Sequence, residues 1–399
     1  MIEHTTETPK RIFGYSFFSS RILVFLLLMP FMIPAFLNET EVGTVFDFIK
    51  IIVGIVTLVI FLFQNKLSSG IASIALFYIS FIITSIIKSG NVTMAVIIVM
   101  NAVIFSLIIT LGIKLNLRVL CDVLTFYIFL LWTGELVCLF LFPNGIALSK
   151  YYYNPYGFIG IDNQLTPFLI FSFFILFFNL MNKNKPVISV ICFIEMFASA
   201  FITWSATCIV VSFILLAYLI LFYKKKWEVL LNLKVLFPVV IVSFFALVIF
   251  RVQELFRFVI EDILGKSITF TGRTEIWDLA IYQIKQTPLF GRGFYQEYGW
   301  IFWHSKFYYS HNLFLEIMLI GGVFSLAFFA VMIWINVSKI DFKKNRTLAA
   351  LLSICIFSMG MGCLTEAYFK SVFFSAFLVL AYNFSALSDH SQNMIQVKD

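Results

Sequence analysis

The chain is short of charged residues. Only 12% of its 399 residues are Asp, Glu, Lys or Arg, whereas 61% are hydrophobic, and the mean hydropathy is +0.98. Soluble domains carry about 25% charged residues, so this composition excludes a soluble domain and predicts an integral membrane protein. The apolar runs show no alternation with a period of two, which excludes a membrane barrel. Because backbone groups cannot stay unpaired in hydrocarbon, each crossing is expected to be a helix.

The sequence also lacks the signatures of bound metals and nucleotides. Its six cysteines fall inside apolar runs, without metal-ligand spacing and outside the loops where disulfides would form. We expect them to pack as small apolar side chains. No Walker motif or dinucleotide fingerprint is present, which excludes nucleotide hydrolysis as a driving force. We therefore expect no metal, no cofactor and no nucleic-acid partner, and the net charge of +7 indicates anchoring at the membrane surface.

The apolar runs predict an all-α bundle of about 12 transmembrane helices, because each has the length of a helical membrane crossing. They form a single polytopic membrane domain, 1–399. Lys and Arg concentrate in alternate loops, and the loops rich in these residues are expected to be cytoplasmic, together with both termini. The loops at 251–311 and 142–163 then lie outside the cytoplasm. The predicted spans are 21–37, 45–63, 71–87, 92–113, 119–141, 163–181, 187–203, 206–223, 235–250, 312–336, 347–365 and 368–386.

The large loop, 251–311, is rich in basic residues despite its predicted exported position. Apolar residues at helical spacing from Ile276 to Ile284 predict a helix that carries Arg273 in its first turn and ends at Pro288. Free amides at a helix start and a nearby guanidinium favour an anion. Alternatively, Arg273 bonds its own loop through carbonyls or Glu275. The basic residues are Arg251, Arg257, Lys266, Arg273, Lys285, Arg292 and Lys306.

The loop ends in Ser310-His311-Asn312, at the start of the next predicted span. Ser310 is expected to cap that helix and His311 to lie in its first turn. The positive helix end disfavours an imidazolium, so His311 is predicted to stay neutral and able to accept a proton. An ordinary capping or interfacial histidine is the alternative. Asn312 and Glu316 lie one turn apart and are expected to line one polar pocket.

Aromatic and acidic residues mark further candidate positions. Tyr309 and its aromatic neighbours either stack on sugar rings or belong to the interfacial belt of the membrane. The same two interpretations hold for the tyrosine-rich second loop, 142–163, which ends near Asp162. Glu366 begins the last exported turn, where an acidic residue near the membrane is costly and suggests a function. Glu135 and Glu195 lie within predicted spans, where they either have a similar role or pair inside the bundle.

Three motifs in this order resemble the O-antigen ligase / Wzy-type polysaccharide polymerase superfamily. They are TGRTEIW at 271–277, PLFGRGF at 288–294 and SHNLFLE at 310–316, followed by two glycines at 321–322. The polar stretch at 160–163 resembles a further short motif of the superfamily. One departure is that many members carry a Ser-Arg pair where this chain has Trp204-Ser205-Ala206-Thr207, so no arginine role is carried over to that position.

The resemblance implies a metal-independent membrane glycosyltransferase with a GT-C-like bundle. Its substrates would be undecaprenyl-pyrophosphate-linked oligosaccharides on the outer face of a bacterial cytoplasmic membrane. Arg273 would hold the pyrophosphate and His311 would activate the attacking hydroxyl. The expected substrate contacts are Arg292, Asn312, Arg257, Tyr309, Asp162 and Glu366.

Polymerase and ligase differ in the acceptor of the glycan. A polymerase extends capsular polysaccharide, exopolysaccharide or O-antigen, with a chain-length regulator and a flippase as partners, whereas a ligase transfers the glycan to lipid A core. The bias towards Ile, Phe, Lys and Asn suggests an AT-rich genome and favours the polymerase. A lipid-linked oligosaccharide flippase is the alternative of a different class. It would show a repeat between halves and charges within spans, rather than one polar loop.

Overall fold

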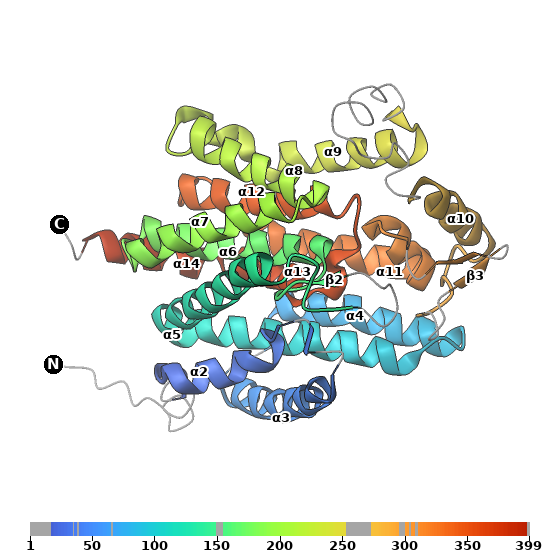
Figure 1. The fold of residues 1–399 in the computed structure, drawn as a ribbon, viewed down its shortest axis with the longest axis horizontal. Helices are drawn as coiled ribbons and strands as arrows, with labels where there is room; N and C mark the ends of the chain where they lie inside the picture. The colour runs from blue at the N-terminus through green and yellow to red at the C-terminus, as the bar shows by residue number, and fades with distance from the viewer. Residues whose placement is uncertain are drawn as a thin grey trace.

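The computed structural model describes residues 17–34, 36–37, 40–64, 67–148, 155–252, 273–294, 300–302, 305–307 and 310–396. Most of these residues are helical, and the long helices lie side by side (Figure 1). The helices are α2 (Arg21–Leu28), α3 (Glu41–Gln64), α4 (Ser69–Ile87), α5 (Val92–Leu141), α6 (Leu165–Met181), α7 (Pro186–Ile202), α8 (Ala206–Ala217), α9 (Leu233–Phe244), α10 (Arg273–Gln286), α11 (Leu313–Val337), α12 (Arg346–Gly362), α13 (Val372–Tyr382) and α14 (Phe384–Gln396).

Short elements join or extend these helices. Two antiparallel ribbons pair β1 (Ala147–Leu148) with β2 (Pro155–Tyr156) and β3 (Trp300–Phe302) with β4 (Ser305–Phe307). The short helical turns are η1 (Met29–Phe31), η3 (Asp162–Gln164), η4 (Tyr218–Phe222), η5 (Lys226–Leu231), η6 (Phe245–Ile249) and η9 (Tyr368–Lys370).

Each of the predicted spans coincides with a helix, but not every helix is long enough to cross a membrane by itself. In the described part of the chain, five helices have the necessary length and apolarity, or six if the bent pair of α13 and α14 counts as one span. Shorter apolar helices occupy the remaining predicted ranges, for example Pro186–Ile202 and Ala206–Phe222. The structure therefore supports a helical membrane protein, without confirming twelve crossings.

Helix α5 is two helices joined at a sharp bend. Asn116 has non-helical dihedral angles, φ −158° and ψ 82°. In a straight helix, Gly112 and Leu120 would lie about 12 Å apart along the axis. Here a Cβ atom on Gly112 would come within 2.8 Å of Leu120 Cδ2, so the chain folds back on itself. The bend falls between the predicted spans 92–113 and 119–141.

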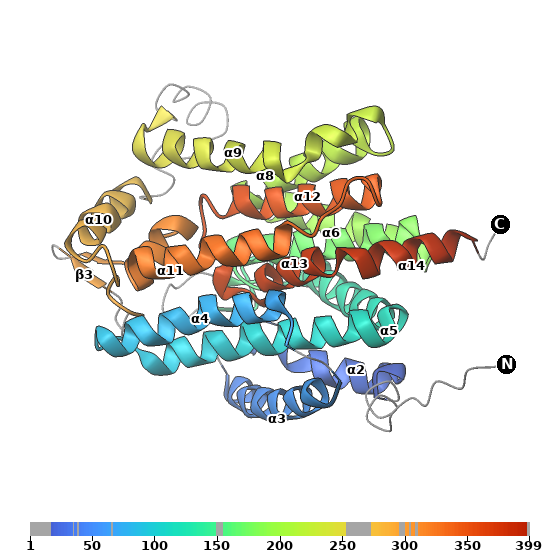
Figure 2. The ribbon, with the colours of Figure 1, turned by 180° about the vertical axis from the view of Figure 1, so that it is seen from behind.

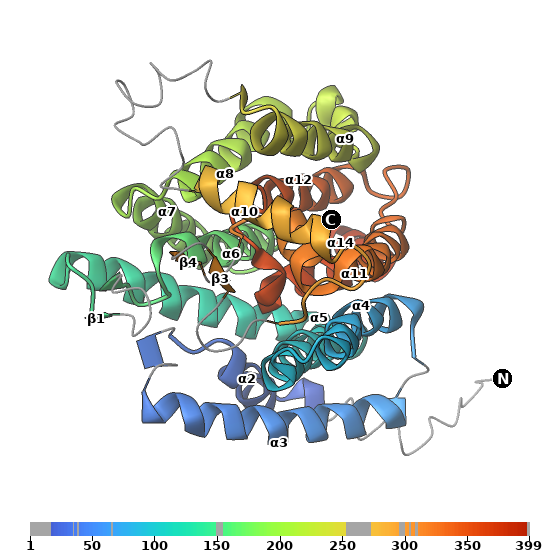
Figure 3. The same ribbon diagram turned by 90° about the vertical axis from the view of Figure 1, so that its right-hand side faces the viewer.

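Helix α3 runs in a different direction from most of the long helices, although the sequence predicts a membrane span at 45–63. In the end-on view of Figure 3 most of the long helices are seen along their axes, whereas α3 is seen lengthwise. It crosses the bundle on the outside, and only 22% of its most apolar window is buried. A sequence pattern reports apolarity but not the direction of a helix, so the predicted span 45–63 could not reveal this orientation.

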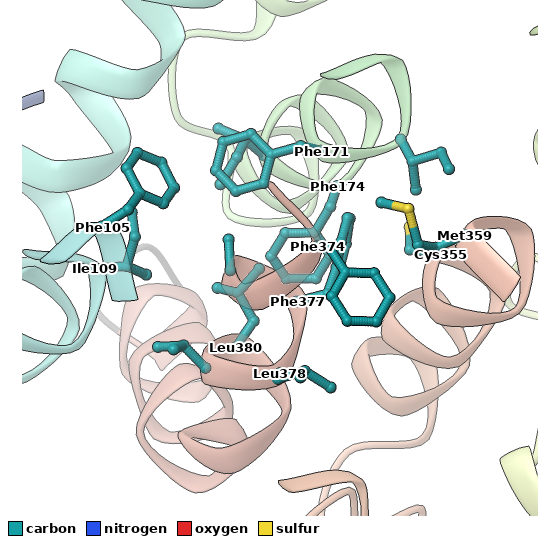
Figure 4. Packing of buried hydrophobic residues seen from close by; sticks show 14 of the residues in the cluster. Phe105, Ile109, Phe171, Phe174, Cys355, Met359, Phe374, Phe377, Leu378 and Leu380 are labelled. Carbon is teal, nitrogen blue, oxygen red and sulfur yellow. The ribbon is translucent and has the colours of Figure 1, made fainter. Parts of the chain in front are cut away.

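Phenylalanine side chains fill the centre of the bundle, around α13 (Figure 4). Phe377 packs edge-on against Phe171, with ring centroids 6.1 Å apart, and against Phe174, with centroids 6.3 Å apart. Edge-to-face contacts of this kind add to the stabilisation from burial. They hold the middle of α13 against α6.

Helix α11 is broken at Gly322, where the turn after α10 inserts. Gly322 has φ 61° and ψ −160°, a combination that is essentially restricted to glycine. At the break, Val323 N–H donates to Pro288 O at 2.8 Å, and Arg292 N–H donates to Leu319 O at 2.7 Å. The motif at 288–294 therefore fastens the end of α10 to the middle of α11. Helix α10 itself lies across one end of the molecule, opposite α14 (Figures 1 and 2).

We predict that Gly322→Ala lowers stability by at least about 1–3 kcal/mol, since the left-handed backbone is strained for any side chain. In addition, a Cβ atom would lie 2.4 Å from the carbonyl of Leu289. Gly360→Ala is the control, because its Cβ atom would meet a side chain, Val240, with Cγ2 nearest at 3.2 Å, and no backbone atom. Thermal unfolding in detergent measures both variants, and equal midpoints would contradict this account of the break.

Candidate active site

Glu366 lies in the turn after α12 and binds three side chains from other parts of the chain. Its Oε1 accepts hydrogen bonds from Arg273 Nη2 at 2.6 Å and Asn163 Nδ2 at 3.0 Å, and lies 3.0 Å from His311 Nδ1. The residue is only 4% exposed. A buried carboxylate requires such partners, because an unpaired charge away from water is costly. We call Asn163, Arg273, His311 and Glu366 the Glu366 cluster.

Arg273 is the first residue of α10, so the prediction that it lies in the first turn of a helix is confirmed. Trp277 and Ala280 are both buried and pack against Leu315 and Leu319 of α11. Trp277 also donates from Nε1 to the carbonyl of Ser310 at 3.0 Å. These contacts place α10 over the start of α11, and thereby bring Arg273 to the residues that precede α11.

His311 lies two residues before α11, so the prediction that it lies in the first turn is wrong. Asn312, not Ser310, is the N-cap: its Oδ1 accepts from Phe314 N–H at 3.0 Å and Leu315 N–H at 3.1 Å. Asn caps helices as well as Ser does, so the choice depended on tertiary contacts. Ser310 instead donates from Oγ to Asn312 O and to Glu316 Oε2.

The backbone and the ring of His311 are both constrained. Its φ is +51°, in the left-handed region that residues other than glycine rarely adopt. An ionised carboxylate only accepts hydrogen bonds, so the contact with Glu366 places the proton of a neutral ring on Nδ1. Nε2 is then the proton-accepting atom of the ring. The side chain is 24% exposed, so it lies at the edge of the protein interior.

Asn163 connects the cluster to α6 and α8. Its Oδ1 accepts from Ser205 Oγ at 3.2 Å, and its carbonyl accepts from Tyr368 Oη at 2.9 Å. Nearby, Thr207 and Thr365 share a hydrogen bond of 3.0 Å. Sequence analysis did not single out Asn163 or Ser205 as site residues. The signals in the sequence were the polar motif at 160–163 and the segment 204–207, where many members of the superfamily carry a Ser-Arg pair. The structure links both segments to Glu366 through Asn163.

Asn312 and Glu316 are fully buried and bind other parts of the protein, which gives them structural roles. Besides capping α11, Asn312 donates from Nδ2 to Leu364 O at 2.9 Å. Glu316 Oε1 accepts from Lys370 Nζ at 2.8 Å. Both residues join the start of α11 to the turn that carries Glu366. A contact of Asn312 with substrate stays a prediction.

Arg292 is not part of the Glu366 cluster. Its Nη2 donates to Gln286 Oε1 at 3.2 Å, at the C-terminal end of α10. Arg273 begins the same helix, thirteen residues earlier, which corresponds to about 20 Å along its axis. The expected assistance of Arg292 at the pyrophosphate is therefore not supported by its position.

The remaining candidate residues lie next to the cluster, inside the bundle or outside the described part of the chain. Asp162 is exposed and precedes Asn163, so it lies next to the cluster. Arg257 and Tyr309 lie outside the described residues. Glu135 and Glu195 have partners inside the bundle: Glu135 accepts from Ile159 N–H at 2.7 Å, and Glu195 accepts from Thr133 Oγ1 at 3.0 Å.

An apolar groove begins beside the cluster and continues along the bundle. Leu313 and Phe314, directly after the cap of α11, line its start, and Val337 at the other end of α11 lines it as well. Side chains of α9, α12 and α13 complete the wall, and all of them are apolar apart from the backbone of Gly360. None of the four residues of the Glu366 cluster lines the groove, and its nearest lining residue in the chain, Leu313, follows His311 by two positions.

The arrangement combines a cation, an oriented imidazole and a buried carboxylate. A guanidinium has several N–H donors in a fixed fork, so contact with Glu366 leaves others that suit phosphate oxygens. A carboxylate that fixes one ring nitrogen prepares the other to accept a proton. Among the described residues, no group of three or more His, Cys, Asp and Glu side chains is placed to hold a metal ion.

Comparison with known families supports the resemblance. A model of the O-Antigen ligase family matches residues 188–330. The match runs from α7 into α11, so it includes Arg273 and His311 but not Asn163 or Glu366. The resemblance expected from the sequence motifs is therefore confirmed over this part of the chain, and together with the apolar helices it indicates a membrane protein. No curated protein and no solved structure matches the chain.

We predict that Glu366→Ala destabilises the protein more than the double variant Arg273→Ala/Glu366→Ala. The single substitution leaves a mostly buried guanidinium without its carboxylate. Breaking a fully buried ion pair in this way costs about 3–5 kcal/mol of stability. The cost is smaller here because the Arg273 side chain is 15% exposed. The double variant removes both charges. Thermal unfolding in detergent compares the two, and a lower midpoint for the double variant would contradict the pairing.

Proposed function

We propose that this chain, which matches the O-Antigen ligase family over residues 188–330, polymerises undecaprenyl-pyrophosphate-linked oligosaccharide repeat units. The reaction is glycosyl transfer on the outer face of a bacterial cytoplasmic membrane, and the product is a capsular polysaccharide, exopolysaccharide or O-antigen. The observation that carries the proposal is the convergence of Arg273 and His311 on one carboxylate oxygen. Nearly forty residues separate the two side chains in the sequence.

His311 is proposed to activate the acceptor. A hydroxyl of the acceptor sugar attacks C1 of the donor sugar, and a new C–O bond forms as the bond from C1 to the pyrophosphate oxygen breaks. The hydroxyl proton passes to Nε2 of His311, and the departing undecaprenyl pyrophosphate keeps the electron pair. Glu366 stabilises the imidazolium that results, because it already accepts the hydrogen bond from Nδ1.

Arg273 is proposed to bind the pyrophosphate. Its position at the start of α10 adds the free amides of a helix N-terminus to the guanidinium donors. Such groups stabilise the charge that develops on the leaving group without having to reorganise during the reaction. The hydrogen bond to Glu366 restrains the Arg273 side chain. The pyrophosphate that Arg273 binds is then held at a fixed distance from His311, the base.

The distribution of basic residues supports an exported site. Helices α6, α8 and α11 all begin near the Glu366 cluster, so the turns that follow them lie at the other end of the bundle. Those turns hold Lys183, Lys185, Lys224, Lys225, Lys226, Lys339, Lys343, Lys344 and Arg346. Short loops rich in Lys and Arg stay in the cytoplasm. The cluster then faces outward in a multi-pass, GT-C-like bundle.

The positions of α2 and α13 support cytoplasmic termini. Arg21 starts α2 and pairs at 2.9 Å with Asp122, which follows the bend of α5 and therefore lies at the basic end of the bundle. Tyr382 ends α13 with its ring 5.8 Å from Lys339 Nζ, at that same end. Both ends of the described chain thus lie on the side opposite the Glu366 cluster.

The apolar groove supports a lipid-linked substrate. It begins at Leu313 and Phe314, beside the cluster, and a polyprenyl tail requires an apolar path that continues from the pyrophosphate. A flippase would carry charged groups along a route through the bundle. The cluster instead gathers its charges at one end, which favours an enzyme.

A ligase is the second candidate, because the matching family model is described as O-Antigen ligase. The two activities share the donor and differ in the acceptor. A ligase would transfer the glycan to lipid A core, and a polymerase transfers it to another lipid-linked repeat unit. The compositional bias towards Ile, Phe, Lys and Asn favours the polymerase, because it suggests an AT-rich genome of the kind found in Gram-positive bacteria, which have no lipid A.

We predict that Arg273→Ala and His311→Ala each abolish the polysaccharide ladder in cells, and that the loss exceeds any fall in protein abundance, which is quantified in the same membranes because Glu366 loses a partner in either variant. Single lipid-linked units should accumulate, because the donor loses its leaving-group contact or the acceptor loses its base. Gel analysis of extracted polysaccharide measures the ladder. Arg118→Ala and His390→Ala are matched controls, since α14 lies at the other end of the molecule from α10 (Figure 2) and Arg118 lies close to His390. A normal ladder from either site variant would refute the role assigned to that residue.

Purified protein is expected to extend lipid-linked repeat units in the presence of EDTA. Arg273 and the amides of α10 supply the charge stabilisation that a metal provides in other transferases. Chain length is read by electrophoresis, with lipid A core offered as a competing acceptor. Loss of extension in EDTA would contradict the metal-independent mechanism, and transfer to lipid A core alone would identify a ligase.

A further inference from the structure

We propose that Glu316 and Lys370 are positioning residues for this reaction, which hold His311 against Glu366. The inference rests on the proposed function. Glu316 is fully buried in the first turn of α11, and Lys370 ends η9 with its side chain 22% exposed. Neither residue belongs to the Glu366 cluster, and no motif or spacing in the sequence pairs them.

Both oxygens of Glu316 are used. Oε1 accepts from Lys370 Nζ at 2.8 Å, and Oε2 accepts from the backbone N–H of Ser310 at 2.8 Å and from its hydroxyl at 3.0 Å. A carboxylate in this setting bridges two chain segments with charge-assisted hydrogen bonds, which are stronger than neutral ones. One side chain therefore connects Ser310 to η9.

The two bridged segments carry His311 and Glu366. Ser310 directly precedes His311, and Lys370 follows Glu366 by four residues. On the other side of His311, Asn312 donates to Leu364 O at 2.9 Å, and Leu313 N–H donates to Cys363 O at 2.9 Å. His311 is thus tied to the turn of Glu366 both before and after its own position in the chain.

The backbone of His311 explains why this anchoring matters. With φ at +51°, the residue stays in a conformation that side chains normally avoid. A strained conformation persists only when its surroundings enforce it. Without the bonds from Glu316, Ser310 keeps the hydrogen bond from Trp277 Nε1 to its carbonyl but loses those at its N–H and to the carboxylate. His311 then relaxes to a negative φ, which turns the imidazole away from Glu366. Arg273 stays in place, because α10 packs independently on Leu315 and Leu319.

The test is steady-state kinetics on purified, full-length protein with lipid-linked repeat units. Glu316→Gln should lower kcat by about 100-fold, the cost of misplacing a reacting group by roughly 1 Å. The KM for the lipid-linked unit should change by less than about 3-fold, because Arg273 still binds the pyrophosphate. Lys370→Met should show the same split, and Lys370→Arg should restore most of kcat by supplying another cation to Glu316.

Stability is separated from positioning by a double variant and a matched control. Glu316→Gln/Lys370→Met removes both charges and should recover the thermal midpoint without recovering kcat. Glu228 is an equally buried carboxylate, 3.1 Å from Arg346 Nε at the end of α12 remote from Glu366. Glu228→Gln should lower the midpoint and leave kcat unchanged. A loss of kcat shared by Glu228→Gln, or a wild-type kcat in Glu316→Gln, would overturn the proposal.

A labelling measurement tests the pair without turnover. Diethyl pyrocarbonate modifies accessible imidazoles, and mass spectrometry follows each histidine separately. His311 should react several-fold faster in Glu316→Gln than in the wild type, while His390 reacts at an unchanged rate. An unchanged rate at His311 would overturn the positioning role. If the wild type does not extend lipid-linked units, the proposed function fails, and the labelling rate still decides whether Glu316 holds His311.

Discussion

A carboxylate buried at the end of α12 needs positive and hydrogen-bonding partners, and much of the outer end of the bundle is arranged to provide them. Glu366 binds Asn163 just before α6, Arg273 at the start of α10 and His311 in the chain before α11. A buried charge that loses a partner is strongly destabilising, so these four segments are held together. The same bonds that satisfy Glu366 also set the distance between a guanidinium and an imidazole.

Helix α11 provides the frame for this arrangement. Its first turns support Trp277 and the rest of α10, and its break at Gly322 receives the turn that follows α10. Helix α10 is therefore fastened at both ends, which fixes Arg273 at its start. Asn312 and Glu316 attach the beginning of α11 to the turn of Glu366. In the proposed reaction, this rigidity would keep the pyrophosphate contact and the base in one geometry.

The helices and the start of α10 could be predicted from the sequence. Long apolar runs predict helices that can lie in a membrane, and apolar residues at helical spacing predict a helix with one buried face. The position of His311 relative to α11 did not, since Ser and Asn are equally good caps and Glu316 decides between them through Ser310. The direction of α3 also depended on packing that a single sequence does not encode locally, whereas the predicted helix between Arg273 and Pro288 already implied that Arg292 lies far from Arg273. Asn163 was quoted only as part of a motif, and its bond to Glu366 links positions more than two hundred residues apart.

The most direct test of the account is a structure, determined by electron cryomicroscopy, of the protein bound to an undecaprenyl-pyrophosphate-linked repeat unit. We predict that the pyrophosphate lies within hydrogen-bond distance of Arg273 and that His311 Nε2 faces C1 of the donor sugar from the side opposite the leaving group. The polyprenyl tail should enter the groove that begins at Leu313 and Phe314. A pyrophosphate bound away from Arg273, or a donor sugar out of reach of His311, would contradict the claim that the two residues act in one active site.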